Sequence, residues 1–122
     1  MGGSREKRDW QRQPSESPEG IQTMLNALPA MVGYWDREMR NRMANDAYID
    51  YFGRAPREMR GMHIKDLLGP DLFAKNLPHI EGALAGQAQL FDWEIANPSG
   101  EVRFTQASYI PDTVEGEVRG FF

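Results

Sequence analysis

Few side chains in this sequence have the types and spacing that chemistry requires. The chain has two histidines, His63 and His79, and no cysteine, which excludes disulfides, thiolate metal sites and cysteinyl adducts. Two histidines without cysteine partners make no metal-binding pattern. Asp92 and Glu94 lie on the same side of an expected strand and could form a carboxylate pair. The simpler interpretation is that they make up the solvent-exposed face of that strand. No nucleophile–base or carboxylate constellation can be placed, so we expect no catalytic residue and no enzyme activity.

His63 has two interpretations that the sequence leaves open. It lies in "REMRGMHIKDLLG" (57–69), after a short helix ending at Gly61 and before the apolar helical piece that begins at Ile64. It either starts that second helix at the rim of a pocket or hydrogen-bonds a bound polar ligand. The structural role is favoured, as it is for His79, which follows Pro78 in a helical segment.

Length and charge limit the class of protein. The chain has 122 residues, a length typical of one domain, and a formal net charge of −4. An acidic balance gives no attraction to nucleic acid or to an anionic membrane, so neither is expected as a partner. No run approaches the ~18 apolar residues that a membrane span requires. Together with the absence of cysteine, these features favour a cytoplasmic location.

Residues 1–18 predict a disordered tail or linker, in which 1–4 (MGGS) resemble a cloning remnant. Apart from Met1, Trp10 is its only large apolar side chain, so this segment cannot bury enough surface to offset its ordering entropy. Residues 19–122 are expected to form the folded domain.

Apolar periodicity predicts the first elements of that domain. Ile21, Met24, Leu25 and Leu28 share one face of a helix over 19–28, which Pro29 ends. Two short strands then form a hairpin around a polar turn, and glycines and prolines divide a series of short helices. The expected ranges are 31–36 and 39–44 for the strands, and 45–53, 55–61 and 64–68 for the helices.

A longer helix over 71–86 follows, with Asp71 as its N-cap, and Pro78 forces either a kink or two abutting pieces. Alternating residues then predict three strands over 90–96, 101–110 and 117–122, with turns at 97–100 and 111–116. The fold class is therefore α+β: a five-stranded antiparallel sheet, short helices inserted between the second and third strands, and an N-terminal flanking helix.

Four stretches carry a family resemblance. "GYWDREMRNRMANDAYIDYFG" (33–53) holds a strand, an Asp-containing turn, a strand and a helix-opening Asn, and "APREMRGMHIKDLLG" (55–69) holds short helices with an apolar doublet. "LAGQAQLFDWEIANPSGEVRF" (84–104) and "YIPDTVEGEVRGFF" (109–122) make a closing meander. In this order they resemble a PAS domain, the sensory module of bacterial signalling proteins. The resemblance implies that the last strand is truncated here and that a C-terminal effector domain follows in a larger parent protein.

The resemblance also bears on cofactors. In the light-sensing flavin subclass, the reactive Cys position falls on Ile64, the flavin-binding Asn on Thr105, and the final Gln beyond Phe122, so flavin is not expected. The Cys-attached chromophore of photoactive yellow protein is excluded as well. Haem-binding PAS domains use a His on the long helix, where His79 lies, although an oxygen-sensor-type ligand would fall near Lys75. Haem ligation also needs a second group that orients the imidazole.

By the family's register, we expect a cavity between the sheet and the inserted helices, with room for an unidentified small molecule. Gly33 beside two Trp and a Tyr leaves room for a flat or apolar ligand with a few hydrogen-bonding groups. The alternative is that these side chains fill the interior, and a one-residue slip would instead place Phe104 and Ile110 inside. The expected lining is Gly33, Trp35, Met43, Tyr48, Phe52, His63, Ile64, Leu68, Phe73, Leu77, Ile80, Phe91, Trp93, Ile95, Thr105, Ala107 and Tyr109.

The apolar stripe of the helix over 19–28 must also be covered. It either folds back on its own sheet or pairs with the same helix of a second chain, and the resemblance favours a homodimer. We therefore expect a cytoplasmic PAS sensory module that binds a small ligand and passes the change to an effector of histidine kinase, diguanylate cyclase or phosphatase type. The alternatives are a ligand-free dimerisation or interaction module and a haem gas sensor that uses His79.

Overall fold

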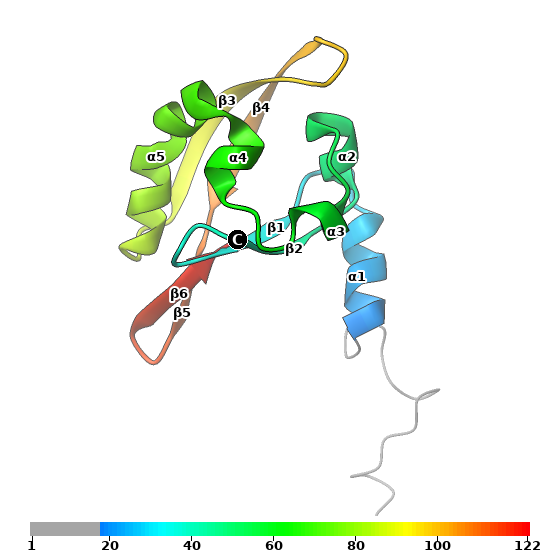
Figure 1. Cartoon of the computed structure of the whole chain (residues 1–122). Helices are drawn as coiled ribbons and strands as arrows, with labels where there is room; N and C mark the ends of the chain where they lie inside the picture. The colour runs from blue at the N-terminus through cyan, green and yellow to red at the C-terminus, as the bar shows by residue number, and fades with distance from the viewer. Residues whose placement is uncertain (1–17) are drawn as a thin grey trace, which may run out of the picture.

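The computed structural model describes residues 18–122, so the predicted tail over 1–18, with its first four residues, lies outside that part except for Pro18. No helix in the described part is long and apolar enough to cross a membrane. The elements, drawn in Figure 1, are α1 (Pro18–Asn26), β1 (Gly33–Asp36), β2 (Asn41–Ala44), α2 (Ala47–Phe52), α3 (Pro56–Met59), α4 (Ile64–Leu68), α5 (Pro70–Leu84), β3 (Gln89–Ala96), β4 (Val102–Tyr109), β5 (Pro111–Val114) and β6 (Glu117–Phe121).

The strands form two antiparallel sheets, which are joined where β4 continues into β5. Four strands lie in the order β2-β1-β6-β5, while β3 and β4 pair along their whole length as a separate ribbon. The chain passes from β4 into β5 through Ile110, whose backbone N–H and C=O both hydrogen-bond to Phe122 at 2.9 Å. The predicted antiparallel α+β fold, with helices between the second and third strands, is confirmed, although the sheet is divided rather than continuous.

The prediction of a turn over 111–116 is wrong in its first part. Pro111–Val114 is strand β5, which pairs with β6, and only Glu115 and Gly116 make the turn. Both have positive φ, 52° and 82°, as a two-residue hairpin turn of this hand requires. Pro111 is tolerated because a proline at the first position of a strand removes little from the ladder.

Helix α5 differs from its prediction at two points. It begins at Pro70 after Gly69, so Asp71 lies in the first turn and is not the N-cap. Proline suits the first helical position, where its missing N–H would have no partner in the helix. The helix runs through Pro78 as one element, so two abutting pieces do not form.

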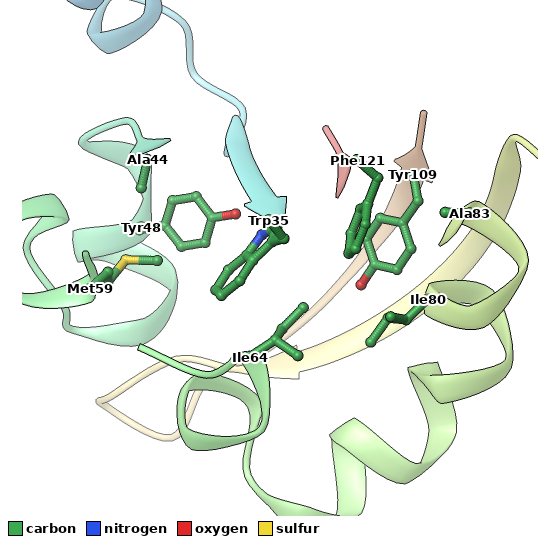
Figure 2. Packing of buried hydrophobic residues seen from close by; sticks show 9 residues of the cluster. All are labelled: Trp35, Ala44, Tyr48, Met59, Ile64, Ile80, Ala83, Tyr109 and Phe121. Atoms are coloured by element: carbon green, nitrogen blue, oxygen red, sulfur yellow. The ribbon is translucent and has the colours of Figure 1, made fainter. Parts of the chain in front are cut away.

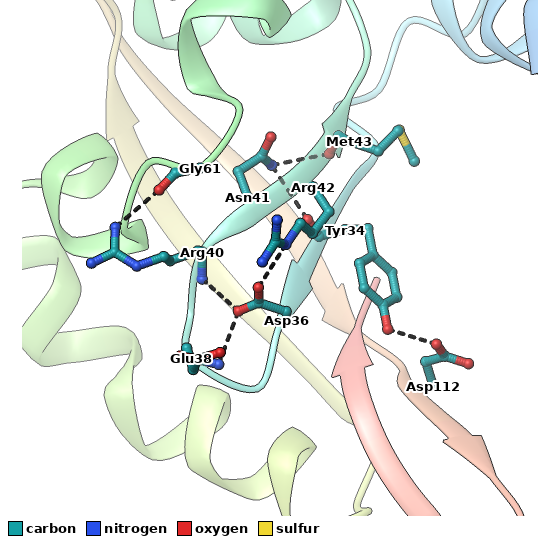
Figure 3. A network of polar contacts seen from close by, with 9 residues as sticks. All are labelled: Tyr34, Asp36, Glu38, Arg40, Asn41, Arg42, Met43, Gly61 and Asp112. Atoms are coloured by element: carbon teal, nitrogen blue, oxygen red, sulfur yellow. Dashed lines mark hydrogen bonds and ion pairs between the residues drawn. The ribbon is translucent and has the colours of Figure 1, made fainter.

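The predicted β1–β2 hairpin is confirmed, with both strands slightly shorter than expected. Asp36 holds its turn in place through several hydrogen bonds (Figure 3). Its Oδ1 accepts hydrogen bonds from the backbone N–H groups of Glu38 and Arg40, and its Oδ2 accepts one from Arg42 Nε at 2.7 Å. Burial alone would raise the pKa of Asp36, but the bonds from Arg40, Arg42 and Glu38 hold that pKa below its usual value.

The core lies between β1, β6 and the end of β4 on one side and the inserted helices on the other. Figure 2 shows Trp35, Tyr109 and Phe121 of the strands facing Ile64 of α4 and Ile80 of α5. Phe121 and Ile80 are fully buried, and Ile64 nearly so. Burying each such side chain contributes about 1.5–3 kcal/mol before entropy is counted.

Helix α1 is attached to the domain by the buried amide of Asn45 and by two further bonds, from Gln22 Nε2 to the Ala44 carbonyl at 3.2 Å and from the Asp46 N–H to Asn26 Oδ1 at 3.0 Å. Asn45, 0 % exposed, donates hydrogen bonds from Nδ2 to the carbonyls of Leu25 and Ala30, both at 2.8 Å, and accepts one from Val32 N–H.

The helix predicted over 19–28 ends at Asn26, so Leu28 lies in the turn after it. The predicted apolar stripe stays outside this attachment: Ile21, Met24 and Leu28 are 44, 51 and 47 % exposed, and only Leu25 is half-buried. Within the described chain, α1 therefore does not fold this stripe back onto the sheet.

Candidate ligand-binding pocket

A pocket of about 390 Å³ lies where β1, α2 and the β3–β4 ribbon meet. None of the described residues that line it carries a formal charge. Five of them are aromatic rings of Trp or Tyr, and the hydroxyl and amide groups of Thr105, Gln106 and Ser108 supply polar atoms. The pocket brings together seven of the predicted lining residues: Gly33, Trp35, Tyr48, Trp93, Thr105, Ala107 and Tyr109.

Gly33 is needed because a tyrosine lies against it. A Cβ atom on Gly33 would be only 2.6 Å from the hydroxyl oxygen of Tyr48, closer than real side chains approach. Tyr48 is held in place by a hydrogen bond with the Trp35 side chain. Burial raises the pKa of Tyr48 to about 12, which outweighs the opposite effect of that bond, so the phenol stays neutral. This wall of the pocket is therefore rigid and uncharged.

The opposite wall contains a second fixed phenol. Tyr109 accepts a hydrogen bond from Asn76 Nδ2 of α5 at 3.2 Å, and both side chains are buried. Burial also raises the pKa of Tyr109. Its ring makes an edge contact with Phe91 at 5.0 Å and a tilted contact with Phe121 at 4.8 Å. These contacts leave Tyr109 little freedom to turn away from a ligand.

Trp93 separates this pocket from a second one. Its indole makes edge contacts with Phe52 and Phe91, and it lines both pockets together with Thr105. The indole Nε1 is buried and has no hydrogen-bond partner within residues 18–122. A buried donor without an acceptor costs about 1–3 kcal/mol. Trp93 is therefore the least satisfied side chain at the site.

The second pocket, about 590 Å³, lies between α5 and the β3–β4 ribbon. His79 lines it and is half-buried, with its ring stacked on Phe91 at a centroid distance of 3.9 Å. His79 Nδ1 lies 3.1 Å from Gln89 Oε1, so this nitrogen is already engaged and Nε2 is the one that remains. Lys75, near which the resemblance places an oxygen-sensor-type haem ligand instead of His79, lines the same pocket.

His63 lies outside all three pockets described here. It caps helix α4, with Nδ1 accepting the backbone N–H of Lys65 at 3.1 Å, and its ring packs edge-on against Phe73. The helix start thus accounts for its position. Within residues 18–122, no three His, Asp or Glu side chains come together as a metal site.

The predicted cavity is divided rather than single. A third space of about 430 Å³, between α2, the α4–α5 turn and β3, takes Phe52, Leu68 and Ile95, while Phe91 lines the second pocket. The remaining predicted residues line none of the three pockets, and of these Ile64, Ile80 and Phe73 pack in or against the core. The residues that the prediction placed on the cavity wall and that lie elsewhere are Met43, His63, Ile64, Phe73, Leu77 and Ile80.

Several lining residues were missed by sequence reasoning. Ala30, Met31 and Val32 precede β1, and Ser108, Ile110 and Phe122 lie where β4 passes toward β6. Strand alternation places Ser108 and Ile110 on the outer face, and Ile110 and Phe104 are 53 and 79 % exposed. Ser108 and Ile110 still line the first pocket because it opens between two strand edges, whereas Phe104 lines the second. No pattern in the sequence marks such an opening.

The fold can now be compared with known proteins. A family model described as the PAS fold matches residues 25–122, whereas the search of curated proteins finds no match. The PAS domain of BvgS from Bordetella pertussis is similar with 23% identity and a TM-score of 0.65, over 84% of this chain and 79% of that one. A PAS domain from Colwellia psychrerythraea has 12% identity and a TM-score of 0.68, over 81% and 86%.

VqmA of Vibrio cholerae, a longer chain, is also similar, with 18% identity and a TM-score of 0.69 over 86% of this chain and 49% of that one. At these identities the structural likeness concerns the fold alone. The family model covers most of the chain, and the strand and helix order agrees with it. This chain therefore belongs to the PAS family, the sensory domains of signalling proteins.

Proposed function

We propose that this domain senses a small uncharged molecule that binds in the pocket between β1, α2 and β4. The observation that carries the proposal is the lining: aromatic walls, a few hydroxyl and amide groups, and no formal charge among the described residues. A charged ligand would lose its hydration there without gaining a counter-charge, whereas an uncharged aromatic or heteroaromatic molecule would not. Among proteins of the same fold, VqmA is known bound to DPO, which supports a small ligand.

The route for the signal runs through the segment that joins α1 to β1. Ala30 and Val32 line the pocket, and both are hydrogen-bonded to Asn45, which also holds Leu25 of α1. A ligand that contacts this segment differently in two conformations would shift the position of α1. The receiving effector is proposed to be a histidine kinase, diguanylate cyclase or phosphatase in a cytoplasmic parent protein.

Native mass spectrometry of the protein as purified, compared with its denatured mass, tests ligand binding. Extra mass that disappears on denaturation supports the proposal, and its value identifies the molecule. Ala107→Trp fills the pocket and should abolish that extra mass, while Thr113→Trp, on the exposed part of β5, should keep it. A bare mass for the unsubstituted protein at all concentrations would contradict ligand sensing.

We also propose that α1 pairs with α1 of a second copy, because its exposed stripe has no cover in the described chain. Met24→Glu places a charge in the stripe and should convert a dimer to a 13.9 kDa monomer in size-exclusion chromatography with light scattering. Thr23→Glu, an exposed neighbour outside the stripe, should leave the dimer intact. A 13.9 kDa species for the unsubstituted protein at micromolar concentration would contradict the dimer.

Two other functions each have one observation in their favour. The filled core around Ile64, Ile80 and Phe121 favours a ligand-free interaction module, which a bare dimeric mass would support. The contact of Gln89 with His79 Nδ1 is the kind of bond that orients an imidazole ligand, which favours a haem sensor. A Soret absorption band after addition of haemin, lost in His79→Ala, would support haem binding.

A further inference from the structure

The second pocket, between α5 and the β3–β4 ribbon (Figure 1), contains a histidine whose ring is held by two contacts. The imidazole of His79 stacks on Phe91, with a centroid distance of 3.9 Å and an interplanar angle of 1°. At the edge of the ring, Nδ1 lies 3.1 Å from Oε1 of Gln89. The stacking fixes the plane of the ring, and the bond to Gln89 fixes its rotation within that plane.

The Gln89 amide determines which nitrogen of His79 carries a proton. Gln89 Nε2 donates to the carbonyl oxygen of Gln87 at 3.0 Å, so the amide oxygen is the atom that faces the imidazole. Because an amide oxygen only accepts, His79 Nδ1 must be the donor. Gln89 can take this place because α5 has Gly82 beside it, where a Cβ atom would collide with the amide nitrogen. The other imidazole nitrogen, Nε2, makes no hydrogen bond with any described residue.

A lysine lies one helical turn from this histidine. Lys75 precedes His79 by four residues, so the two share one face of α5, and both line the pocket. The Lys75 ammonium group makes no hydrogen bond or ion pair within residues 18–122. Asp92 and Glu94 also border the pocket, but they alternate with the inward side chains of β3 and are exposed on its outer face. The positive charge of Lys75 is therefore not neutralised in the pocket.

The rest of the lining offers apolar surface beside this charge. Leu72 lies on the same face of α5, and Phe91 and Trp93 point inward from β3. The pocket has a volume of about 590 Å³, within the range of small-molecule sites. A flat ring can therefore pack against these side chains while an anionic group meets Lys75 and His79.

We propose that the second pocket binds an aromatic carboxylate, a ligand class that differs from the uncharged molecule of the first pocket. Its carboxylate accepts charge-assisted hydrogen bonds from Lys75 Nζ and from His79 Nε2, which takes up a proton from solvent on binding. The bond from His79 Nδ1 to Gln89 persists, because an amide oxygen accepts from the neutral and from the protonated imidazole. Binding at this site does not depend on a ligand in the first pocket.

Indole-3-acetate and its neutral counterpart indole-3-acetamide test the proposal on the unsubstituted protein. The two probes have the same rings and nearly the same shape, and they differ in the charge that Lys75 and His79 recognise. Titration calorimetry should show that the acetate binds about tenfold or more tightly than the amide. Equal affinities, or no binding of the acetate at concentrations up to about 5 mM, would overturn the proposal.

Two substitutions locate the site. Lys75→Met keeps the alkyl chain of an exposed residue and removes its charge, while His79→Phe keeps a ring stacked on Phe91 and removes both nitrogens. Each should weaken binding of the acetate by about fivefold or more. Lys65→Met removes the same charge from an exposed position of α4 outside the pocket and should not change the affinity. Unchanged affinity in Lys75→Met, or an equal loss in Lys65→Met, contradicts the assignment.

Ala107→Trp separates this site from ligand sensing in the first pocket. Ala107 lines the first pocket and not the second, so this variant should bind indole-3-acetate as tightly as the unsubstituted protein. Loss of binding in Ala107→Trp together with unchanged binding in Lys75→Met would place the probe in the first pocket and overturn the proposal. Retained binding of the acetate by a protein whose native mass is bare would support the second site and contradict the sensing proposed for the first.

Discussion

The hydroxyl of Tyr34 donates a hydrogen bond to Asp112 Oδ2 at 2.6 Å, joining β1 to β5 across the intervening strand β6 (Figure 3). The ring passes over Gly120, where a Cβ atom would be 2.8 Å from the Tyr34 hydroxyl and 2.3 Å from the Trp35 carbonyl oxygen. The side chain thus bridges the sheet only because the middle strand has a glycine beneath it.

This bond predicts a loss of stability in alkaline solution. Burial, followed by the bond to Asp112, raises the pKa of Tyr34 to about 12, whereas the unfolded chain has a tyrosine pKa of about 10. The folded state therefore holds the proton more tightly. This contribution is fully present below about pH 10 and is lost as the pH rises toward 12.

Urea unfolding at several pH values between 8 and 12 measures that loss. Tyr34→Phe should lower the free energy of unfolding at pH 8 by about 1 kcal/mol and should make its decline above pH 10 shallower. Some decline should persist, because burial also raises the pKa of Tyr48 to about 12. Parallel curves for the two proteins would show that Tyr34 is not the group responsible.

Gly33→Ala should destabilise the protein by about 1–3 kcal/mol, since the new methyl group meets the Tyr48 hydroxyl at 2.6 Å in a packed site. Thermal or urea unfolding of the single variants and of the double variant with Tyr48→Phe forms a double-mutant cycle. Removing the hydroxyl should recover part of the loss. If the two effects simply add, the glycine is not required by Tyr48.

The sequence predicted the fold better than it predicted the pocket, for physical reasons. Strand β3 was recognisable because Phe91 and Trp93 alternate with Asp92 and Glu94, and burial follows that alternation. The division of the interior could not be read in this way. It depends on how large side chains such as Trp93 and Phe91 pack against one another, which is a property of rotamers and not of periodicity.

Asn45 shows a second limit. The sequence allows either Asn45 or Asp46 as the N-cap of α2; Asp46 occupies that place, and the Asn45 amide turns inward to Leu25, Ala30 and Val32. Short-range capping rules cannot reveal bonds between residues so far apart in the chain. Only the fully buried location of Asn45, which the fold creates, makes these bonds stronger than the local one.

Asn45→Ala should therefore cost about 2–4 kcal/mol of unfolding free energy, because three backbone groups lose their partner in a buried place. Amide hydrogen exchange over residues 19–26 should accelerate as α1 detaches. Asn97→Ala removes a comparable set of bonds in an exposed turn and should cost less than about 1 kcal/mol. Equal costs for the two variants would contradict the anchoring role of Asn45.

The two interior tryptophans should respond differently to the same substitution. The Trp35 indole donates to the buried hydroxyl of Tyr48, so Trp35→Phe leaves that hydroxyl without its donor and should cost about 1–3 kcal/mol beyond the lost packing. The Trp93 indole N–H has no partner among the described residues, so Trp93→Phe relieves a buried, unsatisfied donor while it also removes packing area. Its net cost should be smaller than that of Trp35→Phe by about 1 kcal/mol or more in urea unfolding. A cost for Trp93→Phe as large as that for Trp35→Phe would mean that the Trp93 N–H has an acceptor in solution, and the acceptor would then have to come from a buried water or a bound ligand.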